Sequence, residues 1–82
     1  MICANTEASV TAYGETLTVR RNSENGMWQT SLGTQHCNAK GALRDEVREM
    51  IRVSGEDPND FWEQIESILE EIVYQPNGHC EE

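Results

Sequence analysis

The chain has 82 residues and a formal net charge of −9 at pH 7, so it forms one small domain (1–82) with a modest core. No stretch approaches the ~20 apolar residues of a membrane span, and the start lacks the basic and apolar regions of a secretion signal. The three cysteines show no paired spacing. These features exclude a disulfide framework and predict a cytoplasmic protein with reduced thiols.

The charge is distributed unevenly along the chain. Residues 1–55 carry six acids and six bases, whereas residues 56–82 carry nine acids and no base. Such a distribution repels nucleic acid and attracts positively charged surfaces. We therefore expect a basic protein surface as the partner, possibly that of a nucleic-acid-binding effector complex, with no direct binding to nucleic acid or membrane.

Residues 7–37 predict a small antiparallel sheet. Polar and apolar side chains alternate through Glu15–Arg20, which places Leu17 and Val19 on one face. Asn22–Gly26 is typical of a hairpin turn, because Asn-Gly tolerates positive φ. The sequence therefore predicts two paired strands on either side of this turn.

The strand after the turn is predicted to run from Met27 to Leu32. Its alternation places Trp28, Thr30 and Leu32 on one face, and Gly33 ends it. Residues 34–37 add a short edge or a connection. The whole region predicts a β-meander of two or three strands with one buried face.

Residues 38–54 predict the first helix. Asn38 is a suitable N-cap and Gly55 a suitable residue after the helix end. The apolar stripe consists of Leu43, Val47, Met50 and Ile51. A row of bases follows at four-residue spacing, namely Arg44, Arg48 and Arg52. Asp45 and Glu49 lie beside this row and are expected to pair with it at i, i+3.

Residues 57–75 predict a second, acidic helix that begins with Asp57 as N-cap and Pro58 in the first turn. Its apolar stripe consists of Phe61, Ile65, Ile68, Leu69 and Ile72. The opposite side carries Asp60, Glu63, Glu66, Glu70 and Glu71. Residues 76–82 are expected to be a tail. The architecture is α+β, with both helices packed on one face of the sheet and the acidic side turned outward.

The acidic side is the strongest functional signal in the sequence. Like charges at i+3 and i+4 destabilise a helix by roughly 0.2–0.5 kcal/mol per pair, and ordinary surfaces mix the two signs. The helical rise spaces these carboxylates ~4.5–6 Å along the axis, close to the ~3.4 Å of phosphates on one nucleic-acid strand. The alternatives are a merely solubilising face, or neutralisation by the chain's own arginines, which geometry limits to Glu66 and Glu71.

Aromatic residues border the acidic side. Trp62 lies at its seam with the apolar stripe, together with Val73, and Tyr74 lies within the acidic arc. Aromatic side chains beside charges are favoured at binding hot spots, although Trp62 also fits a core position. The candidate partner-binding residues are therefore Asp60, Glu63, Glu66, Glu70, Glu71, Trp62 and Tyr74.

Catalytic and metal-binding signals are weak. The repeated pairs His36-Cys37 and His79-Cys80 suggest a zinc site, but structural zinc ligands are usually two to four residues apart. The sequence contains no nucleophile, phosphate-loop or metalloprotease motif. We therefore expect no catalytic residues, no metal and no cofactor, and interpret the protein as a binding module rather than an enzyme.

A single compact domain, a neutral hairpin half and a strongly acidic helix from Asp57 to Glu71 resemble the phage-encoded anti-CRISPR proteins. The resemblance covers the whole chain in size, charge and layout and involves no shared motif. It implies an inhibitor that occupies a guide-RNA or target-DNA site on a CRISPR effector complex, with carboxylates in place of phosphates.

Two alternatives stay open. The hairpin of residues 17–32, followed by Lys40–Arg44, is similar to the start of HicB-type antitoxins, although the expected glycine- and proline-rich turn is missing. Such an antitoxin or adaptor would use the acidic side against a basic toxin. A dimerising structural subunit would instead place Trp62 and Val73 in a self-interface.

Overall fold

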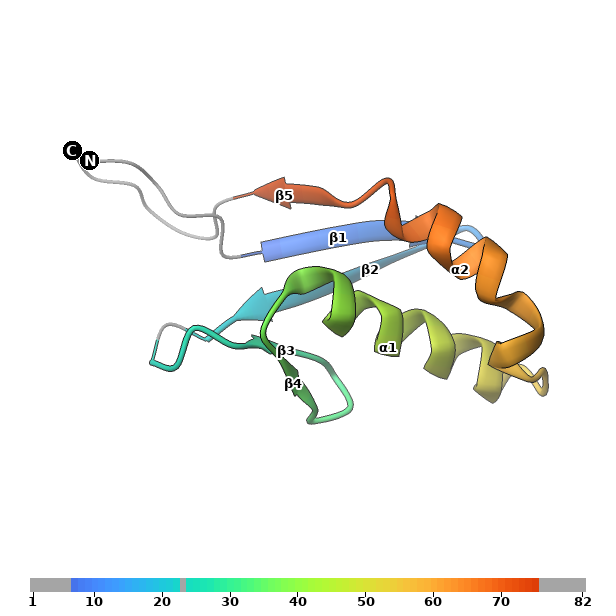
Figure 1. Ribbon diagram of the computed structural model, residues 1–82, viewed down its shortest axis with the longest axis horizontal. Helices are drawn as coiled ribbons and strands as arrows, with labels where there is room; N and C mark the ends of the chain where they lie inside the picture. Colours follow the sequence, from blue (N-terminus) through green and yellow to red (C-terminus); the bar gives the residue numbers. More distant parts are fainter. Residues whose placement is uncertain (1–6, 23, 76–82) are drawn as a thin grey trace.

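The computed structural model describes residues 7–22 and 24–75, and Figure 1 shows helices layered against a sheet. In chain order the elements are β1 (Glu7–Ala12), β2 (Glu15–Arg21), β3 (Trp28–Gln29), β4 (Gln35–His36), α1 (Ala39–Val53), the 3₁₀ helix η1 (Pro58–Phe61), α2 (Trp62–Leu69) and β5 (Val73–Gln75).

The strands form one antiparallel sheet in the order β4-β3-β2-β1-β5. The first four follow one another as a meander, and β5 returns to pair with β1. This architecture confirms the predicted α+β class. The sheet has five strands rather than two or three, because β4 and β5 add to the predicted strands; β4 is only two residues long, and β5 lies where a helix was predicted.

The loops of the meander explain why the third strand is shorter than predicted. Asn22 and Met27 close the first loop through a backbone hydrogen bond of 2.7 Å. After Gln29 the chain turns again, and the backbone N–H of Thr30 donates to the carbonyl of Thr34 at 3.0 Å. Trp28 and Thr30 are buried as predicted. Leu32 lies in the turn and is exposed, so its predicted place beside them was wrong.

The first helix confirms its predicted boundaries. The Asn38 side chain accepts a hydrogen bond from the backbone N–H of Gly41 at 2.7 Å and caps the helix. At the other end Gly55 has φ +94°, and the backbone N–H groups of Gly55 and Glu56 donate to the carbonyls of Arg52 and Ile51. These two bonds form a Schellman motif, which satisfies carbonyls left free at the helix end.

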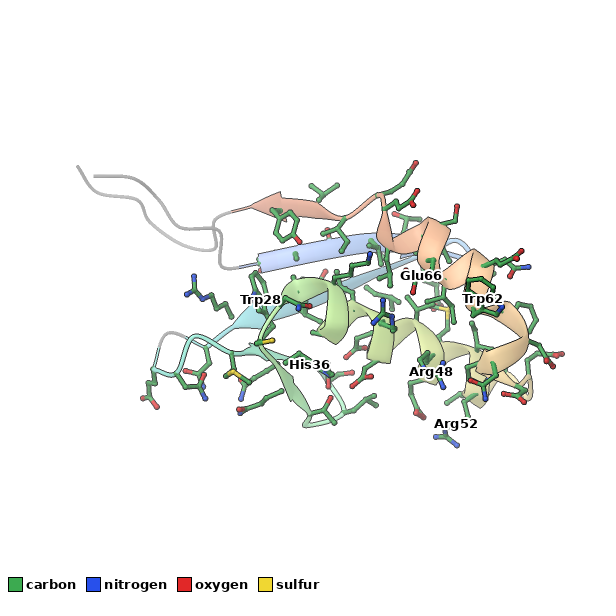
Figure 2. All side chains as sticks on the ribbon, in the orientation of Figure 1. Trp28, His36, Arg48, Arg52, Trp62 and Glu66 are labelled. Carbon is green, nitrogen blue, oxygen red and sulfur yellow. The ribbon has the colours of Figure 1, made fainter. Side chains whose placement is uncertain are left out.

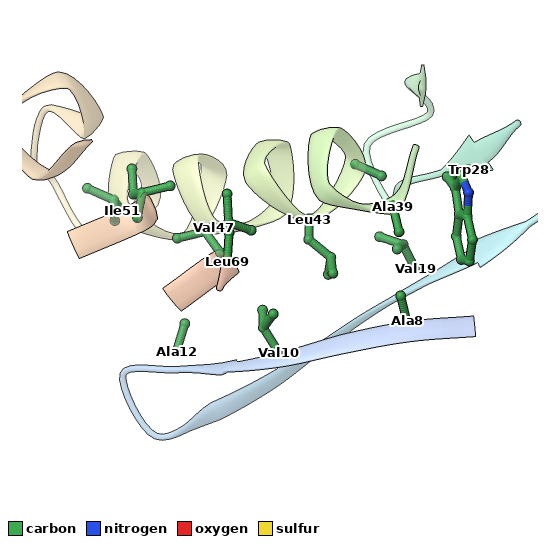
Figure 3. Close-up of a cluster of buried hydrophobic side chains, with 12 residues drawn as sticks. Ala8, Val10, Ala12, Val19, Trp28, Ala39, Leu43, Val47, Ile51 and Leu69 are labelled. Carbon is green, nitrogen blue, oxygen red and sulfur yellow. The ribbon is translucent and has the colours of Figure 1, made fainter. Parts of the chain in front are cut away.

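The core lies between the sheet and both helices (Figure 3). The small side chains of Ala8 and Ala12 on β1 and of Ala42 on α1 permit close packing of helix against sheet. Leu43, at the centre, is fully buried, and truncating such a side chain costs ~2–5 kcal/mol. The buried residues are Ala8, Val10, Ala12, Val19, Trp28, Ala39, Ala42, Leu43, Val47, Ile51, Ile65 and Leu69.

The second predicted helix, 57–75, was wrong in its C-terminal part. Asp57 caps the start and Pro58 opens the first turn as predicted, but this turn is 3₁₀ and α2 ends at Leu69. Residues 73–75 form β5 instead. A β-branched and an aromatic residue suit a strand, and pairing with β1 satisfies backbone groups at the sheet edge. The predicted tail, 76–82, lies outside the described residues.

Candidate functional site

The η1–α2 segment turns an apolar side inward and an acidic side outward. Ile65 and Leu69 are buried against the sheet and α1, and Phe61 and Ile68 are partly buried beside them. This burial fixes the rotation of the helix, so the residues on its other side must face solvent. Four acids are exposed on that outer side and define the acidic face: Asp60, Glu63, Glu70 and Glu71.

Within residues 7–22 and 24–75, the side chains of the acidic face make no ion pair with the rest of the chain. Figure 1 places α2 at the border of the helical layer, where one side is open. Glu63 and Glu70 are seven residues apart, which corresponds to about 10 Å along the axis. The acidic face therefore presents several unneutralised carboxylates over the length of α2.

The last turn of α2 adds a local electrostatic cost. Glu70 is the C-cap, Glu71 follows it, and the turn contains no base. Because the C-terminus of a helix carries partial negative charge, an acid there is unfavourable by ~0.3–1 kcal/mol at low ionic strength. Two of the four carboxylates on the acidic face thus occupy positions that helix stability disfavours.

Glu66 was predicted to contact the partner, but the structure places it in an internal ion-pair cluster. Its carboxylate accepts a hydrogen bond from Arg44 at 2.9 Å and lies 3.7 Å from the Lys40 ammonium. Glu66 is therefore a bridge from α2 to α1 and does not belong to the acidic face. Helical geometry predicted that the chain's own arginines could reach only Glu66 and Glu71. The structure shows such an ion pair at Glu66 and none at Glu71 among the described residues.

All six bases of the sequence are engaged by groups of the same chain. Arg20 pairs with Glu7, Arg21 donates to the Gly26 carbonyl, and Arg48 donates to Asn59. Arg52 pairs with Glu49 at i, i+3, as predicted. The hydrogen bond from Arg52 lowers the pKa of the Glu49 carboxyl, and the same bond raises the pKa of Arg52. With Lys40 and Arg44 held by Glu66, no base is left to cover the acidic face.

Trp62 lies on the surface of α2 and is 61% exposed. Figure 2 shows it on the same part of the molecule as Glu66 and Arg48. The alternative that placed Trp62 in the core is wrong, because Phe61 supplies the inward-facing ring instead. An exposed indole beside the acidic face is available for contact with a partner.

Tyr74 was predicted to lie within the acidic arc, and the structure corrects this. It lies on β5 opposite Ala8, and its ring meets Trp28 edge-on with 6.3 Å between centroids. Val73 pairs with Ser9 and so projects from the opposite face of the sheet. The predicted self-interface of Trp62 with Val73 is therefore not assembled on one surface.

A polar cluster that sequence reasoning did not predict joins β4 and the β3–β4 loop to α1. Asp45 Oδ2 lies 2.6 Å from His36 Nε2 and accepts a hydrogen bond from the Thr34 hydroxyl at 3.0 Å. Nearby, the Glu46 carboxylate accepts bonds from the backbone and hydroxyl of Ser31. Asp45 was expected to pair with Arg48, but a partner distant in sequence replaces it.

His36 and Cys37, which are adjacent in sequence, have different neighbours in the structure. His36 uses Nε2 for Asp45, and its Nδ1 lies near the backbone of Gly41 in the first turn of α1. The exposed Cys37 thiol has only a long contact of 3.9 Å with Asn38 Nδ2. Among the described residues no group of three or more possible ligands could hold a metal ion, and the predicted pair His79-Cys80 lies outside them.

Comparison with family models, curated protein sequences and solved structures found no match to this chain. Within residues 7–22 and 24–75, no helix is long and apolar enough to cross a bilayer. The candidate site therefore stands on its geometry alone: the acidic face with the exposed ring of Trp62 at its border.

Proposed function

We propose that this protein is a non-catalytic cytoplasmic inhibitor, and that its acidic face occupies a basic nucleic-acid-binding surface on another protein. The observation that carries the proposal is the charge arrangement. Four exposed carboxylates have no cationic partner among the described residues, while all six Lys and Arg residues are engaged elsewhere. Two of the four carboxylates, Glu70 and Glu71, oppose the helix dipole. An acidic face that is kept although it lowers helix stability is suited to binding a positively charged partner.

The partner class we propose is a guide-RNA-loaded CRISPR effector complex, in keeping with the resemblance to anti-CRISPR proteins. Such complexes hold nucleic acid in positively charged channels. The separation of Glu63 and Glu70 along the axis of α2 equals about three phosphate-to-phosphate spacings of one nucleic-acid strand. The exposed Trp62 would supply a desolvated aromatic contact at the edge of the charged patch.

The test measures target-DNA binding by a panel of purified, guide-loaded effector complexes as the protein is added. We expect competitive inhibition of at least one complex, weakening as salt is raised. The double variant Glu63→Lys with Glu70→Lys should weaken this inhibition about tenfold or more, the equivalent of ~1.4 kcal/mol. Circular dichroism should show that the fold is retained, because both side chains are exposed and unpaired.

A matched control separates the acidic face from overall charge. Glu24→Lys with Thr11→Lys and Thr18→Lys changes the net charge by the same amount at exposed positions in the β2–β3 loop and on the face of the sheet opposite the helices. This control should inhibit as the wild type does. Equal loss in the control would assign the effect to net charge alone. A panel in which the wild type inhibits no complex would show that the proposed partner class is wrong.

A further inference from the structure

A small cavity opens beside the acidic face, where three segments distant in sequence meet. Figure 1 shows the turn between β1 and β2 at the same end of the molecule as the C-terminal end of α1. The cavity has a volume of about 250 Å³ and is lined by Tyr13, Met50, Ile51, Ser54, Glu56 and Phe61. Small-molecule sites usually measure ~300–1,000 Å³, so this one suits a single side chain.

Tyr13 forms one wall of the cavity from an unfavourable backbone conformation. Among the described residues it is the only non-glycine with positive φ, at +52°, and Gly14 follows at +81°. A two-residue hairpin loop of this kind favours Asn or Asp followed by Gly. The left-handed conformation is unfavourable for a residue other than Gly, because its Cβ comes too close to the following carbonyl oxygen. Tyr13 is 56% exposed, so burial in the core does not offset this cost.

The charge at the cavity is negative. Glu56 contributes the only ionisable carboxylate of the lining, its side chain is exposed, and no described group pairs with it. No base lines the cavity. Asp60, from the acidic face, belongs to η1, whose last residue Phe61 forms another wall. The site therefore combines apolar and aromatic walls with a free anion at its rim.

We propose that this cavity receives an arginine side chain of the protein partner, an inference that rests on the proposed function. The aliphatic stem would contact Met50, Ile51 and Phe61, and the planar guanidinium would stack against Tyr13 and pair with Glu56. A lysine ammonium is more strongly hydrated and does not stack, so it fits these walls less well. The acidic face supplies long-range attraction, and the cavity supplies a specific anchor.

The experiment titrates the full chain with N-acetyl-arginine methylamide and follows backbone amides by ¹H–¹⁵N NMR. The matched probe is the citrulline derivative, which has the same shape without the charge. We expect the amides of Met50, Ile51 and Phe61 to shift with the arginine probe and to shift less with citrulline. Equal binding of the two probes, or no shift at these amides, would overturn the inference.

Two variants locate the probe. Glu56→Gln should weaken binding by up to about fivefold, the range of an exposed ion pair, and Glu24→Gln should not. Tyr13→Asn should weaken binding while the melting temperature stays equal or rises, because Asn tolerates the left-handed conformation. Unchanged binding of Tyr13→Asn would contradict the proposed aromatic wall.

The experiments can contradict the cavity inference and the proposed function independently. If the arginine probe leaves the cavity amides unmoved while the wild type still inhibits an effector complex, the cavity inference is overturned and the proposed function stands. If the probe binds as described and no effector complex is inhibited, the cavity inference is supported and the proposed function is wrong.

Discussion

At the scale of single residues, adjacent acids of one helix have different roles. Glu63 and Glu66 are three residues apart and look equivalent in the sequence. The structure leaves Glu63 exposed and unpaired, whereas Glu66 joins Arg44 and Lys40 on α1. The difference comes from the rotation of α2, which its buried residues Ile65 and Leu69 fix. Helical periodicity alone gave the border position of Glu66 but not its partners.

This difference predicts unequal effects of one substitution at the two positions. Glu66→Gln should lower the free energy of unfolding by up to ~1 kcal/mol, a small loss because Glu66 and Arg44 are each about two-fifths exposed. Glu63→Gln should change stability by less than ~0.5 kcal/mol, because the relief of like-charge repulsion is offset by the loss of an acid from the first turn of α2, where the helix dipole favours negative charge. Urea denaturation at low salt measures both.

The salt dependence provides the control. In about 1 M salt, where screening acts within ~3 Å, the two variants should approach the wild type in stability. A loss at Glu66→Gln that persists in high salt would show that the side chain contributes through packing rather than through its ion pairs.

At the scale of elements, the sequence predicted α1 fully because its signals are local. Asn38 and Gly55 mark the ends, and a regular apolar stripe lies between them. The end of α2 depended on a distant partner. Ile72 continues the helical stripe of residues 61–69 and is partly buried, but pairing with β1 draws the following residues into β5. Pairing between strands distant in sequence thus overrides the local helical periodicity of the apolar residues.

The strand assignment predicts different costs for two neighbouring residues. Tyr74→Ala should destabilise the fold by ~1–2 kcal/mol, because it removes the edge-on contact with Trp28, worth ~0.5–1.5 kcal/mol, and some apolar burial. Val73→Thr should change stability by less than ~0.5 kcal/mol, since Val73 is exposed on the open face of the sheet. Thermal denaturation followed by Trp fluorescence measures both.

If α2 instead continued through residue 75, Tyr74 would lie among acids on the surface. Tyr74→Ala would then be nearly neutral, and the near-ultraviolet dichroism of Trp28 would not change. That result would contradict the pairing of β5 with β1.

At the scale of the whole molecule, the Lys and Arg residues are engaged in internal contacts, and four exposed acids without an ion pair among the described residues form the acidic face. The sequence predicted an acidic side, and four of its seven candidate residues form the acidic face, with Trp62 exposed beside it. The cavity with Tyr13 could not be predicted, because its lining comes from the β1–β2 turn, the end of α1 and η1. These three segments come together only when the helices pack on the sheet.

If the acidic face serves binding, stability and affinity should respond in opposite directions when its charge is removed. Glu70→Gln with Glu71→Gln removes two anions from the negative end of α2. At low salt this should raise the free energy of unfolding by ~0.5–1.5 kcal/mol in urea denaturation, through the helix dipole and one relieved like-charge pair. Inhibition of the effector complex should weaken in the same variant, because two carboxylates of the contact are lost. Glu24→Gln, outside α2, should change neither quantity. A variant that gains stability and inhibits as well as the wild type would identify the acidic face as a solvated surface without a partner.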